Sequence, residues 1–87
     1  MSDIKKRFDL SVKMITKLKI EPSNDEKLKL YSLFKQSNFG NCTLPEPSRI
    51  NFVDHAKWKA WISTKGMSTD TAMTLYSDLV MQLIDKN

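Results

Sequence analysis

Apolar residues recur every three or four positions through the first 18 residues of the chain. Since an α-helix turns by about 100° per residue, this spacing places them on one helical face. The stripe consists of Ile4, Phe8, Val12, Ile15 and Leu18. The pattern predicts a helix from about residue 2 to residue 18, which Glu21 and Pro22 separate from the next element.

The second helix has the clearest start signal in the sequence. Ser23 is a suitable N-cap and Glu26 completes a capping box, so this helix is expected to continue to about Asn38. On one side of it lie Leu30, Leu33 and Ser37, and on the other lie Leu28, Tyr31 and Lys35. One side can pack into a core, which leaves a second side that is apolar, aromatic and cationic together.

The rest of the chain predicts a loop and two more helices. Residues 39–51 are expected to form the loop, because Pro45 and Pro47 exclude a regular helix. A third helix is predicted over residues 52–64, and Ser68 is the N-cap of a fourth. The apolar stripe of the fourth helix consists of Ala72, Leu75, Tyr76, Leu79 and Leu83.

Length and composition favour a single small domain. The chain has 87 residues, of which 40% are hydrophobic, and no β pattern, so we expect one all-α four-helix bundle over residues 1–87. Cys42 is the only cysteine, which excludes an internal disulfide. No apolar stretch approaches the roughly 20 residues that span a bilayer. We therefore expect a soluble cytoplasmic monomer that does not insert stably into membranes.

The net charge of +4 favours a polyanionic partner, either nucleic acid, anionic lipid or a phosphorylated small molecule. A basic surface that only faces water is an equal alternative. The second side of the second helix adds detail, because an aromatic ring beside an ammonium group suits a ligand with a flat ring and a phosphate. Core packing of Tyr31 and a solvated Lys35 are the alternatives at this point.

Three ordered motifs cover nearly the whole chain. They are PSNDEKLKLYSLFKQ followed by G, then FVDHAKWKAW, then KGMSTDTAMTLY. In these motifs the chain resembles the acyl-CoA-binding protein family. The matching residues are Pro22, Leu28, Tyr31, Phe34, Lys35, Gln36, Gly40, Ala56, Lys57, Trp58, Ala60, Trp61, Gly66, Ser68, Ala72 and Tyr76. The resemblance implies four helices and a fatty acyl-CoA ligand, with no cofactor.

The resemblance also implies roles for residues at the nucleotide end of the ligand. Tyr31 would donate a hydrogen bond to the CoA 3′-phosphate, and Lys35 would pair with the same phosphate. Phe34 would stack on the adenine. Lys57 would be a second contact to the nucleotide, and Tyr76 would close its pocket.

The acyl chain is expected in an apolar groove near Leu28 and the inner face of the first helix, around Val12 and Ile15. Such a groove is needed because exposure to water costs an acyl chain about 0.8 kcal/mol per CH₂. The anionic CoA end needs cationic partners instead. Thr16 is included in the expected site, at a position where the family often has a lysine near the ligand.

Several residues depart from the family pattern. Phe34 stands where tyrosine is common, so it retains the stacking surface and loses a hydroxyl. Lys27 replaces a usual apolar residue beside Leu28, and its charge is expected to change chain-length preference. Val53 replaces a frequent basic residue, and Ser48 replaces a usual glycine in the loop. These changes are expected to alter affinity and selectivity more than the fold.

No pattern in the sequence points to catalysis. His55 has no metal-ligand spacing to other side chains, and Cys42 has no partner that would make it a nucleophile. We therefore expect a non-enzymatic carrier of medium- to long-chain acyl-CoA esters. Enzymes that use acyl-CoA would be possible recipients of these esters. The alternatives are an acyl-CoA-binding module of a larger enzyme or membrane-recruitment protein, a helical interaction domain and a nucleic-acid-binding module. Dispersed lysines disfavour nucleic acid.

Overall fold

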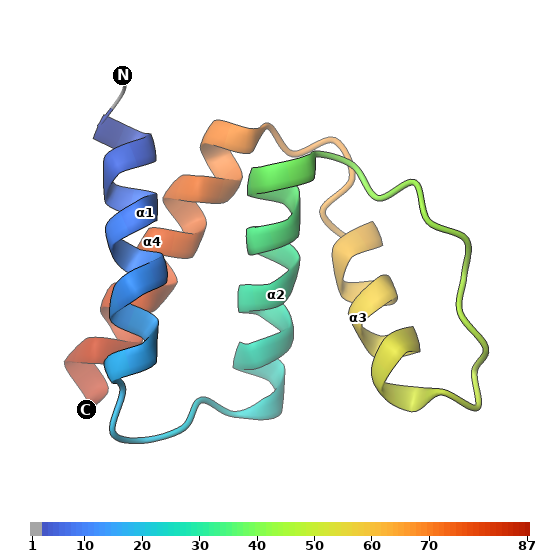
Figure 1. Ribbon diagram of the computed structural model, residues 1–87, viewed down its shortest axis with the longest axis horizontal. Helices are drawn as coiled ribbons and strands as arrows, with labels where there is room; N and C mark the ends of the chain where they lie inside the picture. Colours follow the sequence, from blue (N-terminus) through green and yellow to red (C-terminus); the bar gives the residue numbers. More distant parts are fainter. Residues whose placement is uncertain (1–2) are drawn as a thin grey trace.

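The computed structural model describes residues 3–87 and has four α-helices in chain order (Figure 1). These are α1 (Asp3–Met14), α2 (Asn24–Phe39), α3 (Phe52–Ile62) and α4 (Thr69–Lys86). The described residues include no strand, so the predicted all-α four-helix fold is confirmed. None of the helices in this part of the chain is long and apolar enough to cross a bilayer.

Helix α2 lies at the centre of the arrangement. Helix α4 packs against both α1 and α2, whereas α3 packs mainly against α2 at the edge of the molecule (Figure 1). Residues 40–51 form an extended loop around the outer side of α3. Because it has neighbours on two sides, α2 needs two non-polar faces, which explains the pattern in its sequence.

The main core lies between α1, α2 and α4. Its buried members are Phe8, Leu30, Leu33, Tyr76, Val80 and Leu83. The Phe8 and Tyr76 rings meet edge to face with centroids 5.1 Å apart, a favoured aromatic geometry. Leu30 and Leu33 are therefore on the core side of α2, as predicted, and Ser37 is buried beside them.

The predicted start of α2 is confirmed in detail. The Ser23 hydroxyl accepts from the Glu26 backbone N–H at 3.1 Å, and the Glu26 carboxylate accepts from the Ser23 backbone N–H at 2.8 Å. At the other end Gly40 has a φ of 75° and donates its N–H to the Gln36 carbonyl. The positive φ explains why glycine stands at this position.

Two predicted helix ends are wrong by a few residues. Helix α1 ends at Met14 and continues as a 3₁₀ turn over Ile15–Lys17, and the chain is extended at Leu18. Helix α3 ends at Ile62, and the next residues form turns that lead to Gly66 at a φ of 88°. Both ends tighten into i→i+3 geometry, which apolar spacing alone does not reveal.

The predicted stripe of α4 also needs correction at one position. Leu75 is 39% exposed, whereas Ser77 and Val80 are fully buried. Since α4 packs against both α1 and α2, its buried surface is wider than a single stripe. The buried surface is also rotated around the helix relative to the predicted stripe, because it includes Ser77 and Val80 and not Leu75.

Candidate functional site

Two lysine side chains converge on one aromatic ring between α2 and α3. The Lys35 Nζ atom lies 5.7 Å from the centroid of the Tyr31 ring, and the Lys57 Nζ atom lies 5.5 Å from it. Lys35 also lies 4.9 Å from the Phe39 ring and 5.6 Å from the Trp61 ring. Within residues 3–87, neither lysine forms a salt bridge with a carboxylate. This lysine–tyrosine cluster (Tyr31, Lys35 and Lys57) therefore has positive charge available for an anion.

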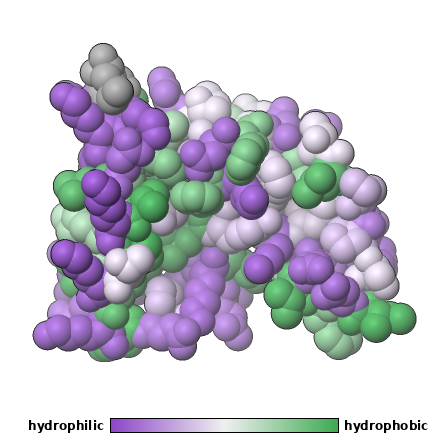
Figure 2. Space-filling view, in the orientation of Figure 1, coloured by the Kyte–Doolittle hydropathy of each residue, from purple (hydrophilic) through white to green (hydrophobic). Residues whose placement is uncertain are grey.

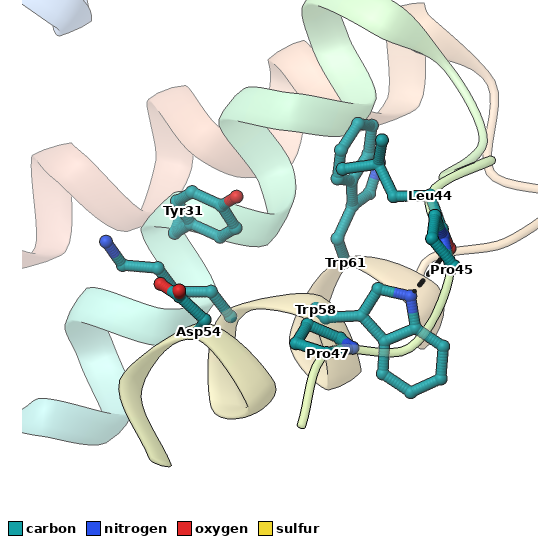
Figure 3. A pocket seen from close by; sticks show the side chains of 8 residues that line it. Tyr31, Leu44, Pro45, Pro47, Asp54, Trp58 and Trp61 are labelled. Carbon is teal, nitrogen blue, oxygen red and sulfur yellow. Dashed lines mark hydrogen bonds between the residues drawn. The ribbon is translucent and has the colours of Figure 1, made fainter. Parts of the chain in front are cut away.

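A hollow of about 250 Å³ adjoins this cluster (Figure 3). Tyr31 reaches it from α2, two tryptophans and Asp54 reach it from α3, and the proline-rich loop closes its outer side. Its lining consists of Tyr31, Leu44, Pro45, Pro47, Asp54, Lys57, Trp58 and Trp61. We call it the loop hollow. Aromatic and proline surfaces around a cationic edge can hold a flat ring that carries a phosphate.

Side chains of α3 hold the loop in place around this hollow. The Trp58 Nε1–H donates to the Leu44 carbonyl at 2.9 Å (dashed in Figure 3). The His55 Nε2 atom lies 2.6 Å from the Glu46 carboxylate. That hydrogen bond, with the nearby Arg49 charge adding to it, lowers the pKa of Glu46. Trp58 is therefore half-buried against the loop, whereas Trp61 is buried.

Gln36 is fully buried and joins the loop to two other parts of the fold. Its Nε2 atom donates to the Met67 carbonyl at 2.8 Å and to the Asn41 Oδ1 atom at 2.9 Å. Its Oε1 atom accepts from the Thr64 hydroxyl at 2.9 Å. Asn41 also accepts from the Gly66 N–H at 2.9 Å. Sequence reasoning matched Gln36 to a motif but gave it no role. Its position next to Ser37, on the predicted core side of α2, was a usable signal that its amide is buried.

A second hollow, of about 390 Å³, lies between the start of α2 and the start of α3. We call it the α2–α3 groove; its lining consists of Asn24, Lys27, Leu28, Phe52, Val53, Ala56 and Lys57. Phe52 is 80% exposed and Val53 is 63% exposed, and hydrophobic residues gather at that edge of the molecule (Figure 2). Lys57 lines both hollows, so the groove and the loop hollow adjoin. Exposed apolar surface beside a groove is typical of a ligand site.

The structure does not bring the predicted acyl-chain residues together. Leu28 lines the α2–α3 groove, whereas Val12 lines a separate hollow between α1 and α2 that also contains Phe34. Ile15 packs against the core. Thr16 is exposed, and its hydroxyl donates to the backbone carbonyl three residues earlier at 2.8 Å. Val12 and Leu28 therefore line different hollows, on the two sides of α2 that face α1 and α3 (Figure 1), and the expected contacts of Val12, Ile15 and Thr16 with the acyl chain stay a prediction.

Two of the aromatic residues predicted at the nucleotide lie away from the loop hollow. Tyr76 is only 4% exposed and packs in the core, with its ring centroid 6.2 Å from that of Phe34. Phe34 is half-buried and lies 6.1 Å from the Phe8 ring. Tyr76 does not line the loop hollow, and its expected closure of the nucleotide pocket stays a prediction. Stacking of Phe34 on an adenine stays a prediction.

The protonation of Tyr31 suits hydrogen-bond donation. Burial raises the pKa of the Tyr31 hydroxyl, and the charges of Cys42 and Asp54 raise it further. A phenol whose pKa lies above 10.0 keeps its proton at neutral pH and can donate to an anion. Asp54 itself accepts from the Asn51 side-chain amide at 2.7 Å, in the first turn of α3.

The residues that the structure describes contain no group of three His, Cys, Asp or Glu side chains that could hold a metal ion. His55 is engaged with Glu46, and Cys42 is a partly buried free thiol. The chemistry of the site is therefore that of an aromatic and cationic binding surface beside an apolar groove.

Comparison with known proteins gives consistent matches. The family model described as "Acyl CoA binding protein" matches residues 5–80. Acyl-CoA-binding protein homolog 1 of Caenorhabditis elegans is 44% identical over 79 residues, which cover 91% of this chain and 92% of that protein. Enoyl-CoA delta isomerase 2 of Rattus norvegicus is 41% identical over 76 residues, but these cover only 19% of the isomerase. The crystal structure of Oryza sativa acyl-CoA-binding protein 2 superposes with a TM-score of 0.90 at 34% identity, covering 95% of this chain and 92% of that one.

Proposed function

Because the chain belongs to the acyl-CoA-binding protein family, we propose that it binds medium- to long-chain fatty acyl-CoA esters and carries them without chemical change. In this role it would buffer the concentration of the esters and release them to enzymes that use acyl-CoA. The observation that carries the proposal is the junction at Lys57, where a cationic aromatic cluster meets an apolar groove.

The lysine–tyrosine cluster is the proposed site of the CoA 3′-phosphate. Two ammonium groups without carboxylate partners can form charge-assisted hydrogen bonds with the phosphate oxygens, each worth about 1.5–3 kcal/mol. The protonated Tyr31 hydroxyl can donate a further hydrogen bond. The loop hollow beside the cluster offers Trp58 and two prolines as apolar surfaces for the rest of the nucleotide.

The α2–α3 groove is the proposed site of the acyl chain. Leu28, Val53 and Ala56 line it, and Phe52 stands exposed at its edge. Each CH₂ removed from water contributes about 0.8 kcal/mol, so an acyl chain should add most of the affinity that distinguishes the ester from free CoA. The groove is open to solvent along the lower edge of the molecule (Figure 2), which suits loading and release without unfolding.

Calorimetric titration with hexadecanoyl-CoA, free CoA and a short oligonucleotide tests the proposal. We expect tight binding of the thioester, weak binding of free CoA and no binding of the oligonucleotide. Oligonucleotide binding with a steep dependence on salt would instead identify the nucleic-acid rival and refute the proposed carrier.

Matched variants test the proposed phosphate site. Lys35→Met and Lys57→Met each remove one ammonium group and retain most of the side-chain stem, so each should weaken hexadecanoyl-CoA binding by about tenfold to a hundredfold. Lys59→Met is the control, because Lys59 lies on α3, is exposed and lines neither hollow. Equal losses in all three variants would point to net charge alone and contradict the assigned cluster.

A further inference from the structure

The α2–α3 groove has a lysine at each end. Lys57 stands where the groove meets the loop hollow, and Lys27 stands with Asn24 in the first two turns of α2. Lys27 precedes Lys35 by eight residues, which corresponds to about 12 Å along the helix axis. Lys27 therefore lies about two turns before Lys35 on α2 and about one turn before Tyr31. Figure 2 shows the lower edge of the molecule indented there, with hydrophilic residues on the α2 side and hydrophobic residues on the α3 side.

Among the residues that the structure describes, the Lys27 ammonium group pairs only with Glu21, which is an exchangeable partner. Its Nζ atom forms a salt bridge with the Glu21 carboxylate at 2.5 Å, and the Glu21 side chain is 77% exposed. Exposed pairs of this kind contribute little to stability, so another carboxylate can replace Glu21 at small cost. The Asn24 side chain forms no hydrogen bond within residues 3–87 and is free to donate its amide N–H groups.

An ordinary acyl chain ends in a methyl group, which gains nothing from an ammonium group beside it. A carboxylate, in contrast, can be buried in an apolar groove only where a cationic or hydrogen-bonding partner is present. The walls of the groove are apolar at Leu28, Val53 and Ala56, and its polar partners at this end are Lys27 and Asn24. The position of these two side chains therefore suits an acyl chain whose far end carries a negative charge.

We propose that Lys27 and Asn24 form a distal subsite for an ω-carboxylate, so that the protein accepts the mono-CoA thioesters of long-chain dicarboxylic acids. The inference rests on the proposed function, since it assumes that the acyl chain lies in the α2–α3 groove. In the complex, Lys27 leaves Glu21 and pairs with the ω-carboxylate, and Asn24 donates a second hydrogen bond.

Paired titrations test this subsite. Saturated acyl-CoA esters of about 10 to 16 carbons are each compared with the mono-CoA thioester of the dicarboxylic acid of equal length. For at least one length, the wild-type protein should bind the ω-carboxyl ester within about threefold of the plain ester. Lys27→Met should weaken binding of the ω-carboxyl ester by about tenfold to a hundredfold relative to binding of the plain ester of equal length.

Two further variants separate the subsite from general charge effects. Lys29→Met makes the same change in net charge at an exposed position that does not line the groove, and it should leave the ratio between the two esters unchanged. Glu21→Gln releases Lys27 and removes a nearby negative charge. It should therefore tighten binding of the ω-carboxyl ester and leave binding of the plain ester unchanged.

The outcomes also distinguish this inference from the proposed function. Binding of plain esters with a tenfold or greater penalty for the ω-carboxyl ester at every length would overturn the subsite and leave the carrier function intact. Equal effects of Lys27→Met and Lys29→Met on the ester ratio would overturn it as well. Failure to bind any thioester would refute the proposed function and the subsite together.

Discussion

Replacement of Gln36 by methionine should destabilise the fold and weaken ligand binding at the same time. Gln36 is fully buried and forms three side-chain hydrogen bonds, to Asn41, Thr64 and Met67. Methionine has a similar length and no amide, so the change removes these bonds without opening a large cavity. The loop that encloses the loop hollow would then lose its anchor to α2.

The expected magnitude follows from the hydrogen bonds that are lost. Three bonds at about 0.5–1.5 kcal/mol each give about 1.5–4.5 kcal/mol in the free energy of unfolding. Thr64 retains a hydrogen bond from its hydroxyl to the Trp61 carbonyl at 2.6 Å, whereas the buried side of the Met67 carbonyl loses its partner. We therefore expect about 3 kcal/mol, near the middle of this range.

Urea unfolding followed by tryptophan fluorescence measures this loss. The midpoint should fall by about 1–3 M, since small proteins lose about 1–3 kcal/mol per molar urea. Gln82→Met is the matched control, because Gln82 is exposed on α4 and its side chain forms no hydrogen bond in the described part of the chain.

Asn41→Ala provides a second readout in case Gln36→Met does not fold. It removes the contacts to Gln36 and to the Gly66 N–H from the loop side, so it should weaken hexadecanoyl-CoA binding in a folded protein. A Gln36→Met midpoint equal to that of the Gln82→Met control, with unchanged binding by Asn41→Ala, would refute the anchoring role.

The other predictions concern local contacts. Ser23→Ala should cost about 0.5–2 kcal/mol of unfolding free energy, measured by urea titration, because it removes the N-cap of α2. The pKa of Glu26 lies below its ordinary value of 4.5, chiefly because its carboxylate accepts the Ser23 backbone N–H. The stability that Glu26 contributes to the fold is therefore present above pH 4.5 and is lost as the pH falls through the folded-state pKa. Glu26→Gln should therefore make the urea midpoint fall less steeply below about pH 4.5 than in the wild type, and an equal slope would contradict this account. Trp58→Phe removes the hydrogen bond from the indole N–H to the Leu44 carbonyl and should weaken hexadecanoyl-CoA binding. Its urea midpoint should change by less than that of a Ser23→Ala variant. Unchanged binding would count against a role for the loop in holding the ligand.

The sequence predicted the fold well because its strongest signals are local. The capping box at Ser23 and the N-cap at Ser68 each act within four residues, so the structure reproduces them. The predicted burial of Leu75 was wrong because it depends on tertiary packing and not on a local signal. Its burial depends on the angle at which α4 crosses two other helices, and spacing along one helix does not contain that angle.

The candidate site was predicted in part. Tyr31 and Lys35 were expected on one face because they lie one turn apart, and the structure places them together. The convergence of Lys57 on Tyr31 came from family resemblance, since the two residues belong to different helices. Val12 and Leu28 were expected at one groove but line different hollows, because sequence patterns do not state on which side of α2 each neighbour packs.

The two-sided character of α2 links stability to binding in a specific way. Its core side holds Leu30 and Leu33. Its other side holds Leu28 and Tyr31 at the two hollows, with Lys35 over the Tyr31 ring. Because α3 packs mainly on this second side, apolar surface there both attaches α3 and forms the wall of the proposed ligand site. A ligand in the α2–α3 groove would therefore contact both helices and add to the interaction that holds α3 in place. The attachment of α3 to α2 and the open groove between them are two consequences of the same packing arrangement.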